Sequence, residues 1–193
     1  MHDLEPYYQW RDYYISEEDK RSPFFRRDYN EFHFTNKVYN YFIHPQWDDF
    51  GSSTLYLKLL YVDYDDGYAI IELIGEWNDA LHNDIMFFKR DIADHLMQEG
   101  ISKFILIGEN VLNFHNSDDD YYAEWYDDLQ EVDGWVVCLG LLPHVIEEMN
   151  RLRLFHYFFY GLRWNSINWR SFTPQDLYSQ VEEYVDKPKL LPG

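Results

Sequence analysis

The sequence predicts an α/β fold: a single mixed β-sheet with helical crossovers, preceded by an aromatic-rich N-terminal extension. Three observations support this class. Residues 104–107 and 135–141 are short apolar runs, typical of strands buried on both faces. Apolar residues at helical spacing lie between these runs along the chain. The turn signal Asp65-Asp66-Gly67 joins two further strand-like segments into a hairpin.

The composition describes an ordered chain of about one domain. It has 193 residues, of which 46% are hydrophobic and 20% aromatic, enough to bury a substantial core. Cys138 is the only cysteine, so we expect no internal disulfide and no zinc cluster, and its apolar neighbours predict that it is buried. The sequence has no signal-peptide pattern and no apolar run of about 18 residues, so we expect a cytoplasmic protein that does not span a membrane.

The charge is strongly negative and regional. The net charge is -19, and residues 63–133 hold nineteen acidic residues against three basic ones. Such a surface repels phosphate backbones and anionic lipid, so we expect neither nucleic acid nor membrane as a partner. A basic protein partner fits this charge, and a solvated, solubilising face is the alternative explanation.

Aromatic residues are concentrated at the start of the chain. Residues 1–50 hold fifteen of them, and disordered tails lack such residues. We expect this arm to pack on the core or on a second subunit of a homo-oligomer. The expected organisation is an arm at residues 1–50, an α/β domain at 54–160 and a C-terminal extension with one helix at 161–193.

Local patterns predict the first elements of the domain. Residues 54–64 and 68–75, on either side of the turn, predict two antiparallel strands. A helix ending at Gly100 follows them. Its apolar face recurs at helical spacing: Ile85, Phe88, Ile92 and Leu96. The next strand is expected at residues 103–108.

Strand and helix alternate in the second half of the chain. An acidic helix is expected at about residues 118–131, and the strand at 135–141 leads to a helix that begins at Pro143. Thr173, followed by proline, begins a last helix. A final short strand is expected within residues 163–172.

The stretch at residues 103–122 joins a buried strand, a loop and a helix start. Loops after buried strands carry function on α/β scaffolds, so we expect the regulatory or chemical work at this junction. The segment Asn116-Ser117-Asp118-Asp119-Asp120 is a helix-start signal. In one explanation it is purely structural: the Ser117 hydroxyl caps free amides and the acids complement the helix dipole.

Residues 67–159 resemble a STAS domain, the fold of anti-sigma factor antagonists and of the cytoplasmic tails of sulfate transporters. Residues 71–79 are similar to the family's opening strand and the turn after it. Residues 104–119 are similar to its central strand and the following Asp-Ser-Ser-Gly loop, which places Ser117 at the phosphoacceptor serine. Residues 135–145 are similar to the later strand and to a helix opening with proline.

The resemblance implies a non-enzymatic regulatory or scaffold protein. In the family, a kinase or an anti-sigma factor docks beside the serine, and phosphorylation governs the docking. The partner expected here is a kinase or an anti-sigma-like factor, bound through residues 114–126. In one version of this hypothesis, phosphorylation of Ser117 controls partner binding. In the other, Asp118 and Asp119 supply a permanent negative charge in place of the phosphate.

Two loops are candidates for the partner-binding surface. The first comprises Asn116, Ser117, Asp118, Asp119, Tyr121 and Tyr122. Because neighbouring residues cannot both face inward on one helix, one of the two tyrosines is left for a partner. Asn78 and Asp79 form the second loop.

Two alternatives involve other chemistry. His115 with Asp118, and His82 with Asp79 and Asp84, offer metal donors if the fold brings both loops together. The other is a small-ligand-binding or hydrolytic enzyme whose carboxylates and aromatic rings form a cleft, a combination that suits carbohydrate. Our hypothesis remains the partner-binding protein, and we assign no catalytic residue, metal or cofactor.

Overall fold

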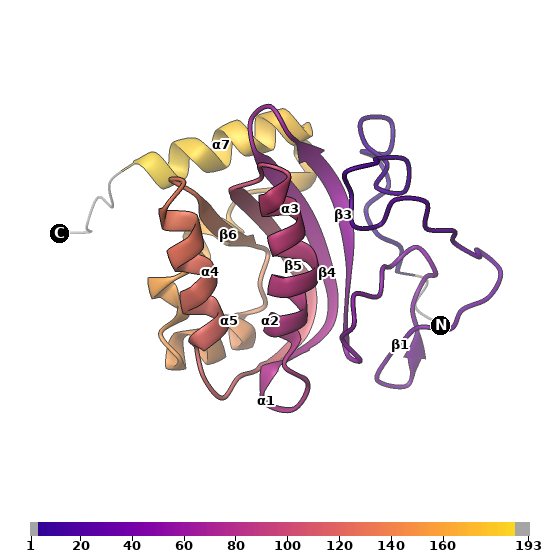
Figure 1. Cartoon of the computed structure of the whole chain (residues 1–193). Coiled ribbons are helices and arrows are strands. Elements are labelled where there is room, and N and C mark those ends of the chain that lie inside the picture. Colours follow the sequence, from indigo (N-terminus) through magenta and orange to yellow (C-terminus); the bar gives the residue numbers. More distant parts are fainter. Residues whose placement is uncertain (1–3, 188–193) are drawn as a thin grey trace.

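The computed structural model describes residues 4–187 of the chain (Figure 1). In chain order its elements are β1 (Lys37–Val38), β2 (Tyr41–Phe42), β3 (Leu55–Asp63), β4 (Tyr68–Asn78), α1 (Asp79–His82), α2 (Asp84–Phe87), η1 (Phe88–Ala93), α3 (Asp94–Gln98), β5 (Lys103–His115), α4 (Asp120–Gln130), β6 (Trp135–Leu139), α5 (Pro143–Arg151), η2 (Leu154–His156), α6 (Leu162–Asn165), η3 (Trp169–Ser171) and α7 (Pro174–Asp186). No helix within these residues is long and apolar enough to cross a membrane.

Strands β3, β4, β5 and β6 form one sheet in this order. The predicted hairpin is confirmed, since β3 and β4 are antiparallel, whereas β4, β5 and β6 run parallel. Each parallel step is made by a helical crossover, as parallel strands require. The mixed α/β sheet predicted from the sequence is therefore confirmed.

The sheet lies between two apolar layers, as the alternation of side chains along each strand requires. On one face, helices α2 to α5 pack against residues such as Leu57, Ile71 and Phe104. On the other face, α7 and the segment before it pack against residues such as Ile70 and Ile105. Both faces are covered, which explains why the strands are almost continuously apolar.

The N-terminal arm lies beside β3 (Figure 1). Asp48 exchanges two backbone hydrogen bonds with Leu57, so the arm pairs with the open edge of the sheet. Trp10, Phe24 and Trp47 of the arm are at most 3% exposed. The division into an arm, an α/β domain and a C-terminal extension stays a prediction, and residues 1–3 and 188–193 of its outer segments lie outside the described residues.

Two local predictions are wrong. The expected strand within residues 163–172 is absent; the described chain forms α6 and η3 there. Strand β5 does not end at residue 108 but continues to His115, since β-bulges opposite β4 keep Val111 and Phe114 buried. The acidic helix expected at about residues 118–131 is confirmed as α4, which begins at Asp120.

The helix between β4 and β5 was predicted as one continuous helix, and its middle is wider than an α-helix. Residues 88–93 form a π-helical segment between α2 and α3. Its insertion places Phe88, Ile92 and Leu96 in the core, as the apolar spacing predicted. It also buries Lys89, which is 1% exposed.

Candidate functional site

The predicted regulatory serine lies in the loop between β5 and α4. The Ser117 side chain is exposed, and its hydroxyl donates a 3.1 Å hydrogen bond to Asp118 Oδ2. Asn116 Oδ1 accepts the Asp118 backbone N–H at 3.1 Å, which makes an Asx turn of the loop. The helix-capping role predicted for Ser117 is therefore wrong, because its hydroxyl does not accept a helix amide.

Asp119 occupies the position before the first helical residue, and its carboxylate does not cap the helix either. Its Oδ2 accepts a 2.6 Å hydrogen bond from the Tyr157 phenol, which ties the loop to the segment after α5. The first-turn amides of α4 thus lack a side-chain cap. Of the three consecutive acids, Asp118 and Asp120 remain exposed.

The two neighbouring tyrosines point in different directions, as predicted. Tyr122 is 0% exposed, so its assignment to the partner-binding surface is wrong. Tyr121 is half-buried, and the Arg90 guanidinium lies 5.7 Å from the centre of its ring. Tyr121 is therefore the member of the pair that a partner can contact.

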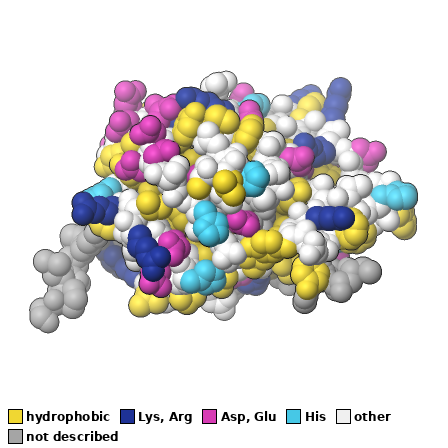
Figure 2. All heavy atoms as spheres, turned by 90° about the horizontal axis from the view of Figure 1, so that it is seen from below, with side chains coloured by type: hydrophobic (Ala, Val, Ile, Leu, Met, Phe, Trp, Pro, Cys, Tyr) yellow, Lys and Arg dark blue, Asp and Glu magenta, His cyan; other side chains and the backbone are white. Residues whose placement is uncertain are grey.

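The two candidate loops meet at one end of the sheet. Asn78 pairs with His115 across β4 and β5, and the Tyr122 phenol donates a 2.6 Å hydrogen bond to Asp79 Oδ2. Asn78 Oδ1 accepts the Leu81 N–H at 3.0 Å and caps α1. Figure 2 shows this end of the molecule, with histidine and hydrophobic side chains in its middle.

Asp79 is a buried residue whose hydrogen bonds lie within the core. It is 8% exposed, and besides Tyr122 it accepts hydrogen bonds from Trp77 Nε1 at 3.0 Å and from the Ile85 N–H at 2.7 Å. Burial raises the pKa of Asp79 to about 7, and the Tyr122 hydrogen bond opposes this shift. This carboxylate links β4, α2 and α4 and is not available to a partner.

Asp84 is likewise enclosed by donors. It is 0% exposed and accepts hydrogen bonds from Ser52 Oγ at 2.6 Å, Thr54 Oγ1 at 3.1 Å and the Asn78 N–H at 2.8 Å. The described part of the chain holds no group of three His, Cys, Asp or Glu side chains arranged for a metal ion. Its principal cavities are lined by residues other than His115, Asp118 and Tyr121, so the carbohydrate-type cleft of the alternative hypothesis does not lie at this junction.

The acids on α4 fall into two groups. Glu124 and Asp128 form ion pairs with the helix after β4: Arg90 Nη1 lies 2.7 Å from Glu124, and buried Lys89 Nζ lies 2.7 Å from Asp128. The second group is exposed and forms no ion pair with any residue that the structure describes. Its members at and near α4 are Asp118, Asp120 and Asp127.

No family model and no curated protein matches this chain. Among the solved structures similar to it is the anti-sigma factor antagonist SpoIIAA in its unphosphorylated form, with 16% identity and a TM-score of 0.48 over 66% of this chain and 96% of that one. Another is the Bacillus cell fate determinant SpoIIAA in its phosphorylated form, with 15% identity and a TM-score of 0.42 over 65% of this chain and 98% of that one. The predicted resemblance to this kind of protein is confirmed as a resemblance. At these values it carries no function over to this chain.

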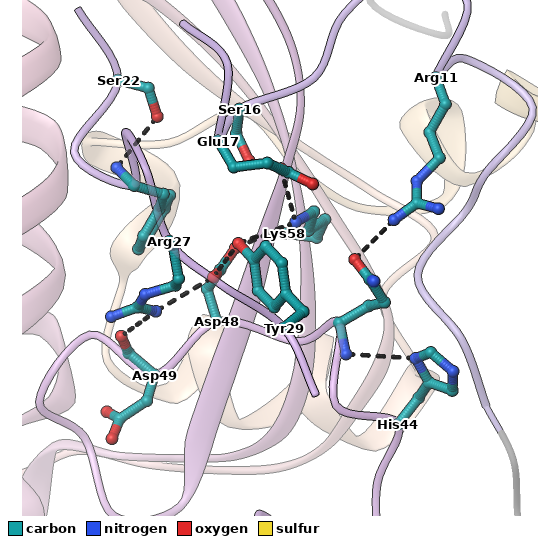
Figure 3. Close-up of polar contacts among 12 residues, drawn as sticks. Arg11, Ser16, Glu17, Ser22, Arg27, Tyr29, His44, Asp48, Asp49 and Lys58 are labelled. Atoms are coloured by element: carbon teal, nitrogen blue, oxygen red, sulfur yellow. Dashed lines mark hydrogen bonds and ion pairs between the residues drawn. The ribbon is translucent and has the colours of Figure 1, made fainter. Parts of the chain in front are cut away.

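A second polar site, which the sequence analysis missed, lies between the arm and β3 (Figure 3). Lys58 projects from the sheet and is 6% exposed. Its Nζ lies 3.1 Å from the Tyr29 hydroxyl and 3.5 Å from both Glu17 Oε2 and Asp48 Oδ2. Arg27 Nη1 adds a 3.0 Å ion pair to Asp48. The arm is thus fixed to the sheet by a buried charge network.

Glu72 lies opposite Lys58 on β4 and is 1% exposed. Its Oε2 accepts the Tyr7 backbone N–H at 2.8 Å, a further link between sheet and arm. Burial raises the pKa of Glu72 to about 7. A signal for this site was present in the sequence, because Lys58 and Glu72 are single charges within apolar strands, where a charge requires a partner.

Proposed function

We propose that this protein is a non-enzymatic regulatory or scaffold protein that binds a protein partner through the loop and helix at residues 114–126. The observation that carries the proposal is a set of exposed carboxylates that form no ion pair within the described residues and lie just before, and on, the helix that carries Tyr121. They are Asp118, Asp120 and Asp127. Interfaces favour an aromatic contact surrounded by charged groups that meet opposite charges.

The charge of this surface specifies the chemistry of the partner. Because Glu124 and Asp128 are already neutralised by Arg90 and Lys89, the free charge lies at the N-terminal end of α4 and along its outer side. A partner with a basic surface gains Coulomb attraction there and is steered toward it. By the sequence resemblance the partner is a kinase or an anti-sigma-like factor, and a second copy of the chain is the homo-oligomeric alternative.

Ser117 is placed to modulate this contact. Its hydroxyl is exposed and bonds only to Asp118 among the described residues, so a phosphate can be added without breaking a contact of the core. The uncapped amides of α4 lie three residues further on and attract negative charge. In the second version of the proposal Ser117 is unmodified and the charge is permanent. The sequence assigned this charge to Asp118 and Asp119, but Asp119 is held by Tyr157, so Asp118 with Asp120 supplies it.

The charge requirement is tested with a double variant, Asp118→Asn with Asp120→Asn. Partner capture from native lysate, quantified by mass spectrometry, should fall in this variant. Asp65→Asn with Asp66→Asn is the matched control, because it removes the same charge from an exposed hairpin turn at another place on the chain. Equal capture by both variants and the parent protein would remove the basis of the proposal.

The role of Ser117 is tested separately. If it is a phosphoacceptor, protein recovered from native cells carries a phosphate at Ser117, and Ser117→Asp changes capture of the same partner while Ser117→Ala behaves as the unmodified protein. If the charge is permanent, no phosphate is found and Ser117→Ala captures as the parent does. Loss of capture in Ser117→Ala protein without phosphate would contradict both versions.

A further inference from the structure

The site between the arm and β3 encloses a cavity of about 280 Å³. Its floor is Lys58 and the two residues after it on β3, and its walls are arm segments. The side chains used below are Arg11, Glu17, Glu31, Gln46 and Lys58. Sites for drug-sized ligands span roughly 300–1,000 Å³, so this cavity suits a small metabolite. It is separate from the partner surface proposed at residues 114–126.

Opposite charges face this cavity from two sides: the Glu17 carboxylate, 3.5 Å from Lys58, and the Arg11 guanidinium. Figure 3 shows Glu17 and Lys58 on one side and Arg11 on the other, with the Glu17 carboxylate and the Arg11 guanidinium turned toward the space between them. Within residues 4–187 Arg11 forms no ion pair, and its guanidinium makes a single hydrogen bond, 2.5 Å from Nη2 to Gln46 Oε1. A guanidinium has five N–H donors in a fork that matches a carboxylate, so most of its capacity is free.

The carboxylate side of the cavity also has free capacity. Glu17 uses Oε2 for the Ser16 hydroxyl at 3.1 Å and for Lys58 at 3.5 Å, which leaves Oε1 without a partner in the described chain. Glu31 contributes a second carboxylate on the Arg11 side, because it accepts a 3.4 Å hydrogen bond from Nε2 of the same Gln46 amide whose Oε1 binds Arg11. The free acceptor of Glu17 and the free donors of Arg11 therefore lie at separate places in the cavity.

We propose that this cavity binds a small zwitterion of the α-amino acid class, with its carboxylate on Arg11 and its ammonium group on Glu17. The rings of Tyr7, Tyr8 and Tyr14 also line the cavity and give the ligand's side chain an aromatic surface. The buried Lys58 network fixes the wall that carries Glu17, so this carboxylate is held in place before the ligand arrives.

The charges that line the cavity disfavour the simpler ligand types. A purely anionic ligand meets Glu5, Glu17 and Glu31 and the field of a chain with net charge -19. A purely cationic ligand meets Lys58 and Arg11 and leaves the free Arg11 donors without an acceptor. A ligand with both charges pairs with the free groups on both sides of the cavity.

The probes are the free proteinogenic amino acids at millimolar concentration, added singly to the full chain. Binding is measured by thermal shift and then by calorimetry. We expect at least one to bind, and its decarboxylated and deaminated analogues to bind at least about tenfold more weakly, because each loses one charge-assisted hydrogen-bonded pair. If no amino acid binds, or if either analogue binds as well as the amino acid, the proposal is wrong.

Two variants test which side chain binds the carboxylate of the ligand and which binds its ammonium group. Arg11→Gln should weaken binding of the amino acid at least about tenfold. It should leave binding of the decarboxylated analogue unchanged, since that analogue has no carboxylate to pair with Arg11. Glu17→Gln should likewise weaken binding of the amino acid, but it should leave binding of the deaminated analogue unchanged, since that analogue has no ammonium group to pair with Glu17. Arg151→Gln, at an exposed arginine of α5, is the control for charge alone. Unchanged amino acid binding in Arg11→Gln overturns the proposal, and selectivity between analogues cannot result from misfolding.

Discussion

Tyr122 and Asp79 are 43 residues apart in sequence and are joined by a buried 2.6 Å hydrogen bond, in which the phenol donates to the carboxylate. The bond connects helix α4, which carries the proposed partner surface, to the end of β4. It is therefore the internal link between the two candidate loops.

Tyr122→Phe removes this donor and leaves a buried carboxylate with one hydrogen bond fewer. We expect the free energy of unfolding, measured by urea denaturation, to fall by about 1–3 kcal/mol. Without the bond the pKa of Asp79 rises further, so the loss should be larger at pH 8, where the carboxylate is ionised, than at pH 5. Tyr126→Phe, on the same helix, is the control; an equal effect of both variants, or no pH dependence, would contradict the assignment.

Glu72 makes stability depend on pH. Its pKa is near 4.5 in the unfolded chain and about 7 in the folded one, so the folded state holds the proton more tightly. Its stabilising contribution is complete below pH 4.5 and is lost as the pH rises to about 7. Glu72→Gln stays neutral and can still accept the Tyr7 N–H, so its melting temperature relative to the parent should increase between pH 5 and pH 8.

The control for this experiment is Glu183→Gln, which removes a carboxylate from the exposed side of α7. A difference between Glu72→Gln and the parent that stays constant with pH would show that the Glu72 carboxyl does not titrate in this range.

Gly75 of β4 lies directly against the backbone of Thr54, the residue before β3. Its φ is +125°, and a Cβ there would lie 2.1 Å from the Thr54 carbonyl oxygen. Gly75→Ala should therefore cost at least about 3 kcal/mol in unfolding free energy, from strain and displacement of the strand together. Gly100→Ala tests strain alone, because its φ is +97° and its Cβ would meet nothing within 4 Å; we expect about 1–2 kcal/mol. Similar losses at the two positions would refute the role of the close approach.

The arm should be required for solubility. A chain that begins near Ser52 lacks the partners of Lys58 and uncovers the apolar residues under Trp10 and Trp47. We expect it to aggregate, as judged by light scattering after size-exclusion chromatography. A truncated chain that stays monomeric, soluble and equally stable would show that the arm does not complete the core.

The order of strands and helices could be predicted because each core element carries its own period of apolar residues. Pro143 at the first turn of α5 and Thr173 as the cap of α7 were predicted for the same reason, since their signals are local. The full length of β5 was not predicted, because bulges shift which side chains face the core, and a bulge leaves no mark in a simple alternation.

The details of the two sites depend on contacts between distant segments. Ser117 fits a capping pattern, but Asn116 forms the loop's turn and Asp119 is held by Tyr157, which fixes the helix start at Asp120. Lys58 was visible as a charge in an apolar strand, whereas Glu17 and Tyr29 come from irregular chain without any period. Only the folded structure brings such groups together.

The second apolar layer of the sheet is built from opposite ends of the chain. Trp10 Nε1 donates a 3.2 Å hydrogen bond to the Phe172 carbonyl, and the rings of Tyr7 and Trp169 lie 4.8 Å apart. During synthesis on the ribosome, the face of β3, β4 and β5 that carries Ile70 and Ile105 therefore stays uncovered until nearly the whole chain has emerged. From the emergence of β5 until the emergence of α7, the nascent protein must keep that surface from aggregating, and the docking of α7 is expected to be the slow step that completes folding.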